Sequence, residues 1–357
     1  MINKQRLVET FLKLVQIDSP SGDEELVSQE LTRRLKVLGG KVEPDSYGNI
    51  ICHFKGQGES LLLNAHMDTV EPGRGINPSI KKDRIISDGR TILGADPKAG
   101  VAIILEALTS LKEDQKSSVP VEVVFTREEE STLGGAMSLD YKKIRSKHGI
   151  IFDGDEGVHR IFVSSPWYLS VLIEVTGRAS HAAEPEKGLS AIEIGAKIIA
   201  QLELGRSDFE TTGTVGLVKG GSAVNAVAEL MEIKAELRSR DKKKLLKEAK
   251  KVEKVVLQLA KQYPEAKIKL KMQEEFQGFK LPPTHPAIQR ATAALKAMSL
   301  EPQLIDTNGG SDANIFHKHG IEVVVVGTGA ANGHTTREYV VIDQMVEAAH
   351  FCEKLLQ

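Results

Sequence analysis

The sequence contains few residues that could cross-link the chain through disulfides or anchor it in a membrane. Only two of its 357 residues are cysteine, Cys52 and Cys352. Neither belongs to a CxxC or CxxxC arrangement, so neither a disulfide framework nor a thiolate metal site is predicted. No apolar run reaches membrane-spanning length. The opening stretch MINKQRLVETFLKLVQI mixes charged and apolar residues at helical spacing, unlike a signal peptide. These absences predict a reduced, cytoplasmic globular protein.

The sequence also has no large excess of positive or negative charge. The 47 basic and 49 acidic residues nearly cancel, for a formal net charge of −2. Bulk attraction to nucleic acid or to an anionic membrane is therefore not expected, which favours a small-molecule partner. A length of 357 residues with 41% hydrophobic content is enough for a substantial core and predicts two domains.

The order of the expected elements changes twice along the chain. Residues 1–164 and 276–357 alternate strands and helices, which predicts a discontinuous catalytic domain with a mostly parallel, three-layer α/β/α sheet. Residues 165–275 follow a βαββαβ order, which predicts a small domain of one sheet and two helices inserted into the first. Within the first segment, Ser21 or Asp23 is expected to cap a helix that runs to Leu38.

Five residues of the metal-binding type stand at or just beyond the ends of apolar runs. They are His66, Asp96, Glu130, Asp153 and His334. Apolar runs are typical of buried strands, and residues at the carboxyl ends of parallel strands gather at one site. Two imidazoles and three carboxylates, without cysteine, suit a pair of divalent cations, most plausibly zinc.

Residues beside these five suggest supporting roles, each with a simpler alternative. Asp68 shares a strand face with His66 and could fix its tautomer, or the two could be an ordinary buried pair. Asp96 opens a helix, so capping alone would explain it. The acidic triplet 128–130 follows a buried strand, where uncompensated charge is costly and a cation would resolve the conflict. In an extended segment one glutamate can ligate a metal while its neighbour acts as a general base, although a solvated acidic loop remains open.

Taken together, the motifs resemble a known family. The strings HMDTV, GADPKAG, EESTLGGA, GRASHAAEPEKGLSA and GHTTREYV are similar, in order and spacing, to those of the co-catalytic zinc metallopeptidases that include peptidase T, carboxypeptidase G and acetylornithine deacetylase. The resemblance covers nearly the whole chain. GADPKAG is closer to peptidase T than to the DMKGG version of the deacetylases, which favours the tripeptidase-like branch.

The resemblance implies two divalent metal ions per subunit, zinc in the first place, with cobalt or manganese possible. It assigns His66, Asp96 and Asp153 to one ion and Asp96, Glu130 and His334 to the other, so that Asp96 bridges them. Glu129 would be the general base and Asp68 the partner of His66. The residue after the bridge is usually Asp or Asn in the family, and here it is Pro97. Because a cis peptide bond costs less before proline than before other residues, a cis Asp96-Pro97 bond is predicted.

For the inserted domain, the resemblance implies a lid that also forms a homodimer. His181 would reach the active site of the partner subunit and support the oxyanion. Asn225, Arg238, Gly310 and Asp312 match positions that meet substrate. Arg238 could form a fork with a peptide carboxylate, or a salt bridge at a strand edge.

The expected activity is hydrolysis of small peptides by an aminopeptidase or tripeptidase. A water that bridges the two metal ions would be the nucleophile, with Glu129 taking its proton. An N-acyl amino acid deacylase, amidohydrolase or carboxypeptidase of the same family is the alternative. The dodecameric aminopeptidases, which have the same ligand chemistry, are a further alternative. In them the insertion lies between the histidine strand and the bridging aspartate, whereas here Asp96 follows His66 by only 30 residues and the insertion comes after Asp153. The spacing therefore disfavours that group. A binding protein that kept the fold but lost catalysis would typically lack a metal ligand or the general base. All five candidate ligands and Glu129 are present, which disfavours this alternative.

Overall fold

The most apolar segments form the centre of a mixed sheet. β3 (Leu61–His66) and β6 (Val121–Thr126) are buried along their whole length, and β7 (His148–Asp155) and β16 (Glu322–Ala331) over most of theirs. In the order β6-β3-β7-β16 these strands are neighbours and pair in parallel. Their carboxyl ends therefore share one edge of the sheet, the edge at which open α/β sheets bind ligands.

Shorter antiparallel strands extend this sheet on both sides. The main order is β1-β2-β6-β3-β7-β16-β17-β5-β4, and both β14 and β15 pair with β8. The added strands are β1 (Lys41–Val42), β2 (Ile50–Phe54), β4 (Ser79–Lys81), β5 (Arg84–Ile86), β8 (Arg160–Ser165), β14 (Phe279–Lys280), β15 (Gln303–Asp306) and β17 (Tyr339–Val341).

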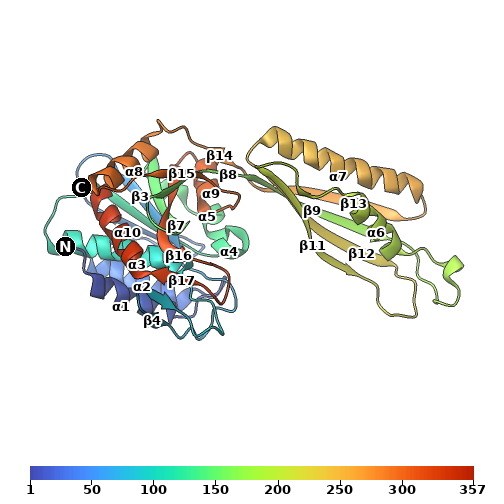
Figure 1. Ribbon diagram of the computed structural model, residues 1–357, viewed down its shortest axis with the longest axis horizontal. Helices are drawn as coiled ribbons and strands as arrows, with labels where there is room; N and C mark the ends of the chain where they lie inside the picture. Colours follow the sequence, from blue (N-terminus) through green and yellow to red (C-terminus); the bar gives the residue numbers. More distant parts are fainter. The chain divides into compact units, whose positions relative to one another are not determined.

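Helices pack against the sheet as the outer layers of the predicted α/β/α arrangement (Figure 1). The long helices are α1 (Lys4–Val15), α2 (Glu25–Val37), α3 (Ala95–Glu113), α8 (Pro286–Ala297) and α10 (Ile342–Leu355). The short ones are α4 (Glu129–Thr132), α5 (Gly134–Ser138), η1 (Tyr141–Lys143) and α9 (Asp312–Lys318). None of the helices combines the length and apolar character needed to cross a membrane.

Helix α3 contacts β3, β7 and β16 of the sheet as well as helices α1 and α10, and so sets the position of the strand edge. Gly100 makes this close approach possible. A Cβ atom at that position would lie 1.9 Å from the carbonyl oxygen of Phe152, the residue before Asp153. A larger residue would push the helix away from the strand.

The second unit is a five-stranded antiparallel sheet of order β10-β11-β12-β9-β13 with two long helices. Alternate residues of β9 and β12, together with one side of each helix, form its hydrophobic core. Its elements are β9 (Trp167–Thr176), η2 (Pro185–Lys187), α6 (Ala191–Gln201), β10 (Gly205–Arg206), β11 (Thr211–Gly220), β12 (Leu230–Ser239), α7 (Lys242–Gln262) and β13 (Lys267–Phe276). Without the short β10, this is the expected βαββαβ order.

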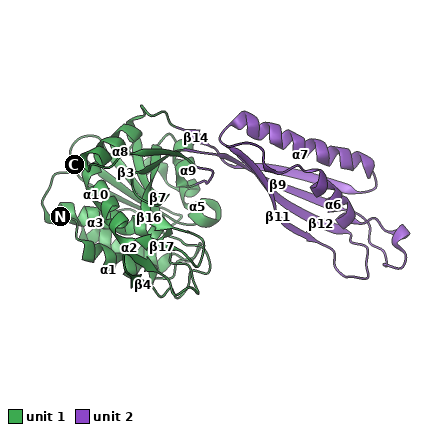
Figure 2. Ribbon diagram, in the orientation of Figure 1, with its two compact units in different colours: residues 1–163, 281–306, 311–357 green, residues 164–280, 307–310 purple.

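The computed structural model describes residues 1–357 and divides them into two compact units (Figure 2). The first comprises Met1–Val163, Leu281–Asp306 and Ser311–Gln357, and the second comprises Ser164–Lys280 and Thr307–Gly310. Residues 164, 276–280 and 307–310 thus lie in the second unit, whereas the sequence pattern places them in the first. The reason is local pairing: β14 pairs with the end of β8, and Ser165 Oγ donates a hydrogen bond to the Gly309 carbonyl oxygen at 2.8 Å.

Candidate metal centre

His66 ends the buried strand β3, and its two ring nitrogens face different partners. Nδ1 lies 3.1 Å from both the carboxylate Oδ1 and the carbonyl oxygen of Asp68. Both of these atoms are acceptors, so Nδ1 is placed to carry a proton. Nε2 lies 3.4 Å from carboxylate oxygens of Asp96 and Asp153. With Nδ1 protonated, Nε2 is the nitrogen that could ligate a metal in place of its own proton.

Asp96 lies between the two histidines of the site. Its Oδ1 is 3.4 Å from His66 Nε2, and its Oδ2 is 3.3 Å from His334 Nε2. His334 also approaches Glu130 Oε2 at 2.9 Å. One carboxylate is therefore shared by two imidazoles, and each imidazole has a further carboxylate of its own, Asp153 or Glu130. The structure thus brings all five candidate ligands together.

The peptide bond between Asp96 and Pro97 is cis, which confirms the prediction. Around it, the carboxylate of Glu338 accepts hydrogen bonds from the backbone N–H groups of Leu93, Gly94 and Asp96, at 2.7, 2.7 and 2.9 Å. Burial raises the pKa of Glu338 to about 7. Sequence reasoning missed this residue, because its only signal was an acid inside the terminal GHTTREYV string.

The acidic triplet does not continue the strand as an extended segment, so that expectation is wrong. Glu128 adopts a left-handed conformation (φ 49°), and α4 begins at Glu129. The backbone N–H groups of Glu129 and Glu130 donate to the carboxylate of Asp68 at 3.0 and 3.2 Å. Asp68 therefore contacts both His66 and the acidic turn, and holds the two in place. Glu129 Oε2 lies 3.9 Å from His66 Nε2, the ring nitrogen that also faces Asp96 and Asp153.

Two further residues that hold this region were not found from the sequence. Ser21 does not cap a helix as expected, because its hydroxyl donates to Asp68 Oδ2 at 2.6 Å and the cap position of α2 is Glu24. The buried Glu24 carboxylate accepts from Arg127 Nη2 at 2.7 Å and from the Glu128 N–H at 3.0 Å. Both contacts join segments far apart in the sequence, which no local pattern reveals.

The charge of the site matches divalent cations. Burial raises the pKa of Glu129 and of Glu130, and it raises the pKa of Asp153 to about 8. Hydrogen bonds to Asp96 and Glu130 raise the pKa of His334 to about 11. These shifts are what a cluster of buried carboxylates produces when imidazoles are its only positive partners. Nitrogen and oxygen donors without sulfur suit zinc, cobalt or manganese.

The expected substrate-side residues belong to both units. His181 and Asn225 lie on neighbouring exposed loops, joined by a hydrogen bond of 2.9 Å from the Ala182 N–H to the Asn225 carbonyl oxygen. Arg238 pairs through Nε and Nη2 with both carboxylate oxygens of Glu236, each at 3.1 Å, which is the salt-bridge alternative rather than a free fork.

Gly310 and Asp312 both pack against other side chains. Gly310 lies so close to the Phe276 ring that a Cβ atom would meet it at 2.1 Å. Asp312 is buried and accepts a hydrogen bond from the Thr126 hydroxyl at the end of β6. Its contact with substrate stays a prediction.

Comparison with known proteins agrees with this geometry. Residues 62–357 match the model of peptidase family M20/M25/M40. The chain belongs to this family. Among solved structures, it is similar to the aminopeptidase PepT from Bacillus cereus, with 36% identity, a TM-score of 0.90 and coverage of 99% of this chain and 98% of that one. It is also similar to a tripeptidase from Staphylococcus aureus, with 34% identity, a TM-score of 0.94 and the same coverage.

A further relative covers the whole chain. The uncharacterized protein YqjE from Bacillus subtilis is 35% identical over 368 aligned positions, which span 100% of this chain and 99% of that protein. The similarity to relatives therefore includes the inserted second unit as well as the first.

Glu338→Gln tests whether the Glu338 carboxylate stabilises the backbone around Asp96. The amide removes a charged acceptor from three backbone donors, so we expect the free energy of unfolding to fall by about 1–3 kcal/mol. We also expect bound zinc to be lost more readily during dialysis. Denaturant unfolding with chelator present, followed by zinc analysis, measures both effects. Glu301→Gln, at an exposed position, is the control. Equal stability of the two variants would contradict the assignment.

Proposed function

We propose that this protein is a di-metal aminopeptidase that removes the N-terminal residue from small peptides, tripeptides above all. The observation that carries the proposal is the Asp96 carboxylate shared between His66 and His334, each with its own second carboxylate. Its support is the similarity, over nearly the whole chain, to structures described as an aminopeptidase and a tripeptidase.

In this proposal His66 and Asp153 hold one zinc ion, Glu130 and His334 hold the other, and Asp96 is common to both. When bound, the two cations supply Lewis acidity for the scissile carbonyl and lower the pKa of the attacking water. Cobalt or manganese could serve in place of zinc, because the donor set is the same. Asp68 keeps His66 in the ligating tautomer through its 3.1 Å contact with Nδ1.

Glu129 is the proposed general base. Its carboxylate is buried within the cluster, and burial raises its pKa well above the usual range, toward the pH at which it must accept a proton. Glu129 takes the proton from the attacking water and delivers it to the departing amine. Its backbone is fixed by Asp68, so the carboxylate keeps its place while it changes protonation state.

The second unit is proposed to act as a lid and to form a homodimer. Beyond Gly213 the outer edge of β11 has no strand partner, and Leu217 and Val218 on this strand are 42% and 46% exposed. Such an edge is suited to pairing with a second copy. The exposed His181 would support the oxyanion in the partner subunit's site. Asn225 is the proposed neighbour of the substrate on the same pair of loops.

Glu129→Gln is the direct test of the base. We expect turnover to fall by about 10²- to 10⁴-fold, because proton transfer loses its carrier, while bound zinc stays unchanged. Peptide hydrolysis and metal analysis on the same preparation measure this. Glu128→Gln, one residue earlier, is the matched control and should keep normal turnover. Near-normal activity of the Glu129 variant would refute its role.

Matched substrates separate peptidase from deacylase activity. We expect release of the N-terminal residue from free-amino tripeptides by the zinc- or cobalt-loaded protein, with little cleavage of dipeptides, N-acetylated tripeptides or simple N-acyl amino acids. Amine release across this panel is the measurement, with the Glu129 variant as the blank. Preferential cleavage of the acylated compounds would instead assign the protein to the deacylases.

Val218→Lys tests the proposed dimer. A charge in the unpaired edge should convert the dimer to a monomer without unfolding it, as measured by analytical ultracentrifugation and circular dichroism. Because His181 is proposed to act in the partner's site, turnover should fall as well. Leu257→Lys, on the exposed face of α7 in the same unit, is the control. Identical sedimentation of the two variants and the unmodified protein would rule out this interface.

A further inference from the structure

A second group of metal-type side chains lies at the opposite edge of the central sheet. His148 begins β7 and Glu322 begins β16, and the two residues are paired in the parallel register. His285 is the N-cap of α8, the first helix after the chain returns to the first unit. Asp153 is five residues farther along β7, about 17 Å at the rise of an extended strand, so this cluster is separate from the first site.

The three side chains converge on one point. His285 Nε2 lies 2.8 Å from Glu322 Oε2, and His148 Nδ1 lies 3.8 Å from the same oxygen. One potential ligand atom from each residue falls within 4.8 Å of the others. Around a tetrahedral zinc ion with bonds of about 2.0–2.1 Å, neighbouring ligand atoms are roughly 3.3 Å apart. The two separations of 2.8 and 3.8 Å bracket this value, and the third pair of ligand atoms lies within 4.8 Å.

His148 supplies the decisive detail. Its Nδ1 is shielded from solvent and has no hydrogen-bond partner. Buried polar atoms nearly always have a partner, so an orphaned imidazole nitrogen that faces a carboxylate and a second imidazole indicates a missing ligand. Glu322 remains 47% exposed, which leaves a coordination position open to water. A pocket of about 310 Å³ lined in part by His148 and Arg290 adjoins the cluster.

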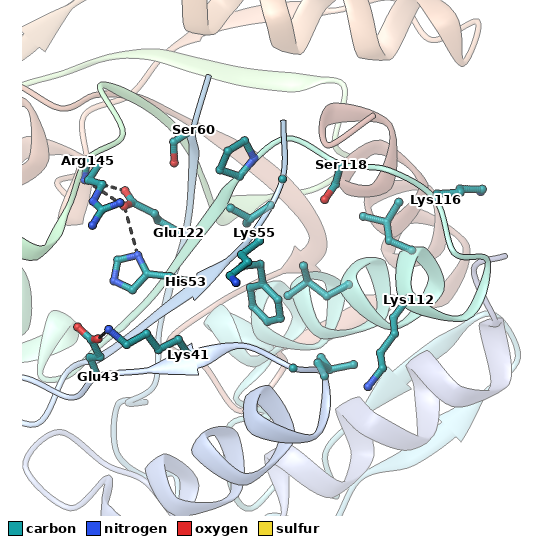
Figure 3. Close-up of a pocket in the computed structure, with 18 of the residues that line it drawn as sticks. Lys41, Glu43, His53, Lys55, Ser60, Lys112, Lys116, Ser118, Glu122 and Arg145 are labelled. Carbon is teal, nitrogen blue, oxygen red and sulfur yellow. Dashed lines mark hydrogen bonds and ion pairs between the residues drawn. The ribbon is translucent and has the colours of Figure 1, made fainter. Parts of the chain in front are cut away.

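A similar pair on the same sheet edge shows what a satisfied arrangement looks like. Glu122 accepts hydrogen bonds from the N–H groups of Arg145 and Ser146 at 2.9 and 2.8 Å. His53 Nδ1 lies 3.3 Å from the same carboxylate (Figure 3). There the carboxylate has two backbone donors, and only one histidine is present. At the His148 cluster, the carboxylate of Glu322 instead faces two histidines.

From these contacts we propose that His148, His285 and Glu322 bind a structural divalent cation, with zinc as the best match. Such an ion would link the starts of β7 and β16 to the start of α8, and so fix the chain where it re-enters the first unit. Binding has one local cost. His285 Nδ1 accepts the cap hydrogen bond of the Ala287 N–H at 3.3 Å, and coordination through Nε2 moves the ring proton to Nδ1. The lost cap is worth about 1 kcal/mol, far less than a structural zinc ion contributes.

The test compares bound zinc in the full-length protein and in His148→Gln after dialysis against a zinc buffer. We expect the variant to hold one equivalent fewer per chain and to keep normal peptide turnover. Zinc should also raise the Tm of a Glu129→Gln protein more than that of the Glu129→Gln/His148→Gln double variant. His350→Gln, at an exposed position of α10, is the control and should lose no zinc.

Equal zinc content of the unmodified protein and His148→Gln would overturn the proposal. Glu322→Gln provides a second variant if His148→Gln folds poorly, and it should show the same loss of one equivalent. Since each comparison is a difference between two proteins, its outcome does not depend on how many ions the first site holds or on which substrate is cleaved.

Discussion

The arrangement of the whole site depends on the carboxylate of Asp68. This one buried group contacts His66 Nδ1, the N–H groups of Glu129 and Glu130, and the Ser21 hydroxyl. It therefore joins the end of β3, the turn after β6 and the N-terminal segment. A carboxylate has about four acceptor positions, and all are used here. Because each donor is held in a fixed direction, the proposed ligand His66, the proposed base Glu129 and the loop that supports them are positioned together.

The charge of the site explains why metal and fold are coupled. Glu129, Glu130, Asp153 and Asp96 are gathered where water is largely excluded, and burial of uncompensated carboxylates is costly. The raised pKa values of Glu129, Glu130 and Asp153 reflect that cost, whereas hydrogen bonds to His334 and His66 lower the pKa of Asp96. Bound divalent cations would offset the cost, so metal binding would stabilise the arrangement as well as supply its chemistry. Glu338, which holds the backbone at Asp96, keeps the shared ligand in place against this repulsion.

Sequence patterns anticipated the architecture better than the local details. Buried strands and the change to βαββαβ order were readable because apolar periodicity reflects which face is covered. The acidic triplet was misjudged as extended, since the turn into α4 is stabilised by Asp68 from another strand. Ser21 was misjudged as a helix cap for the same reason. For Arg238 both a fork with substrate and a salt bridge were open, and the structure shows a salt bridge with its neighbour Glu236.

The sequence by itself determined the identity and order of the metal-type residues, the inserted domain and, through Pro97, the cis bond beside Asp96. These follow from composition, periodicity and motif, which are local properties of the chain. Only the tertiary structure decided which groups support them. Glu24, Ser21, Glu338 and the cluster around His148 acquire their roles from partners tens to hundreds of residues away. Such contacts arise from the packing of strands and helices, and no pattern within one segment encodes them.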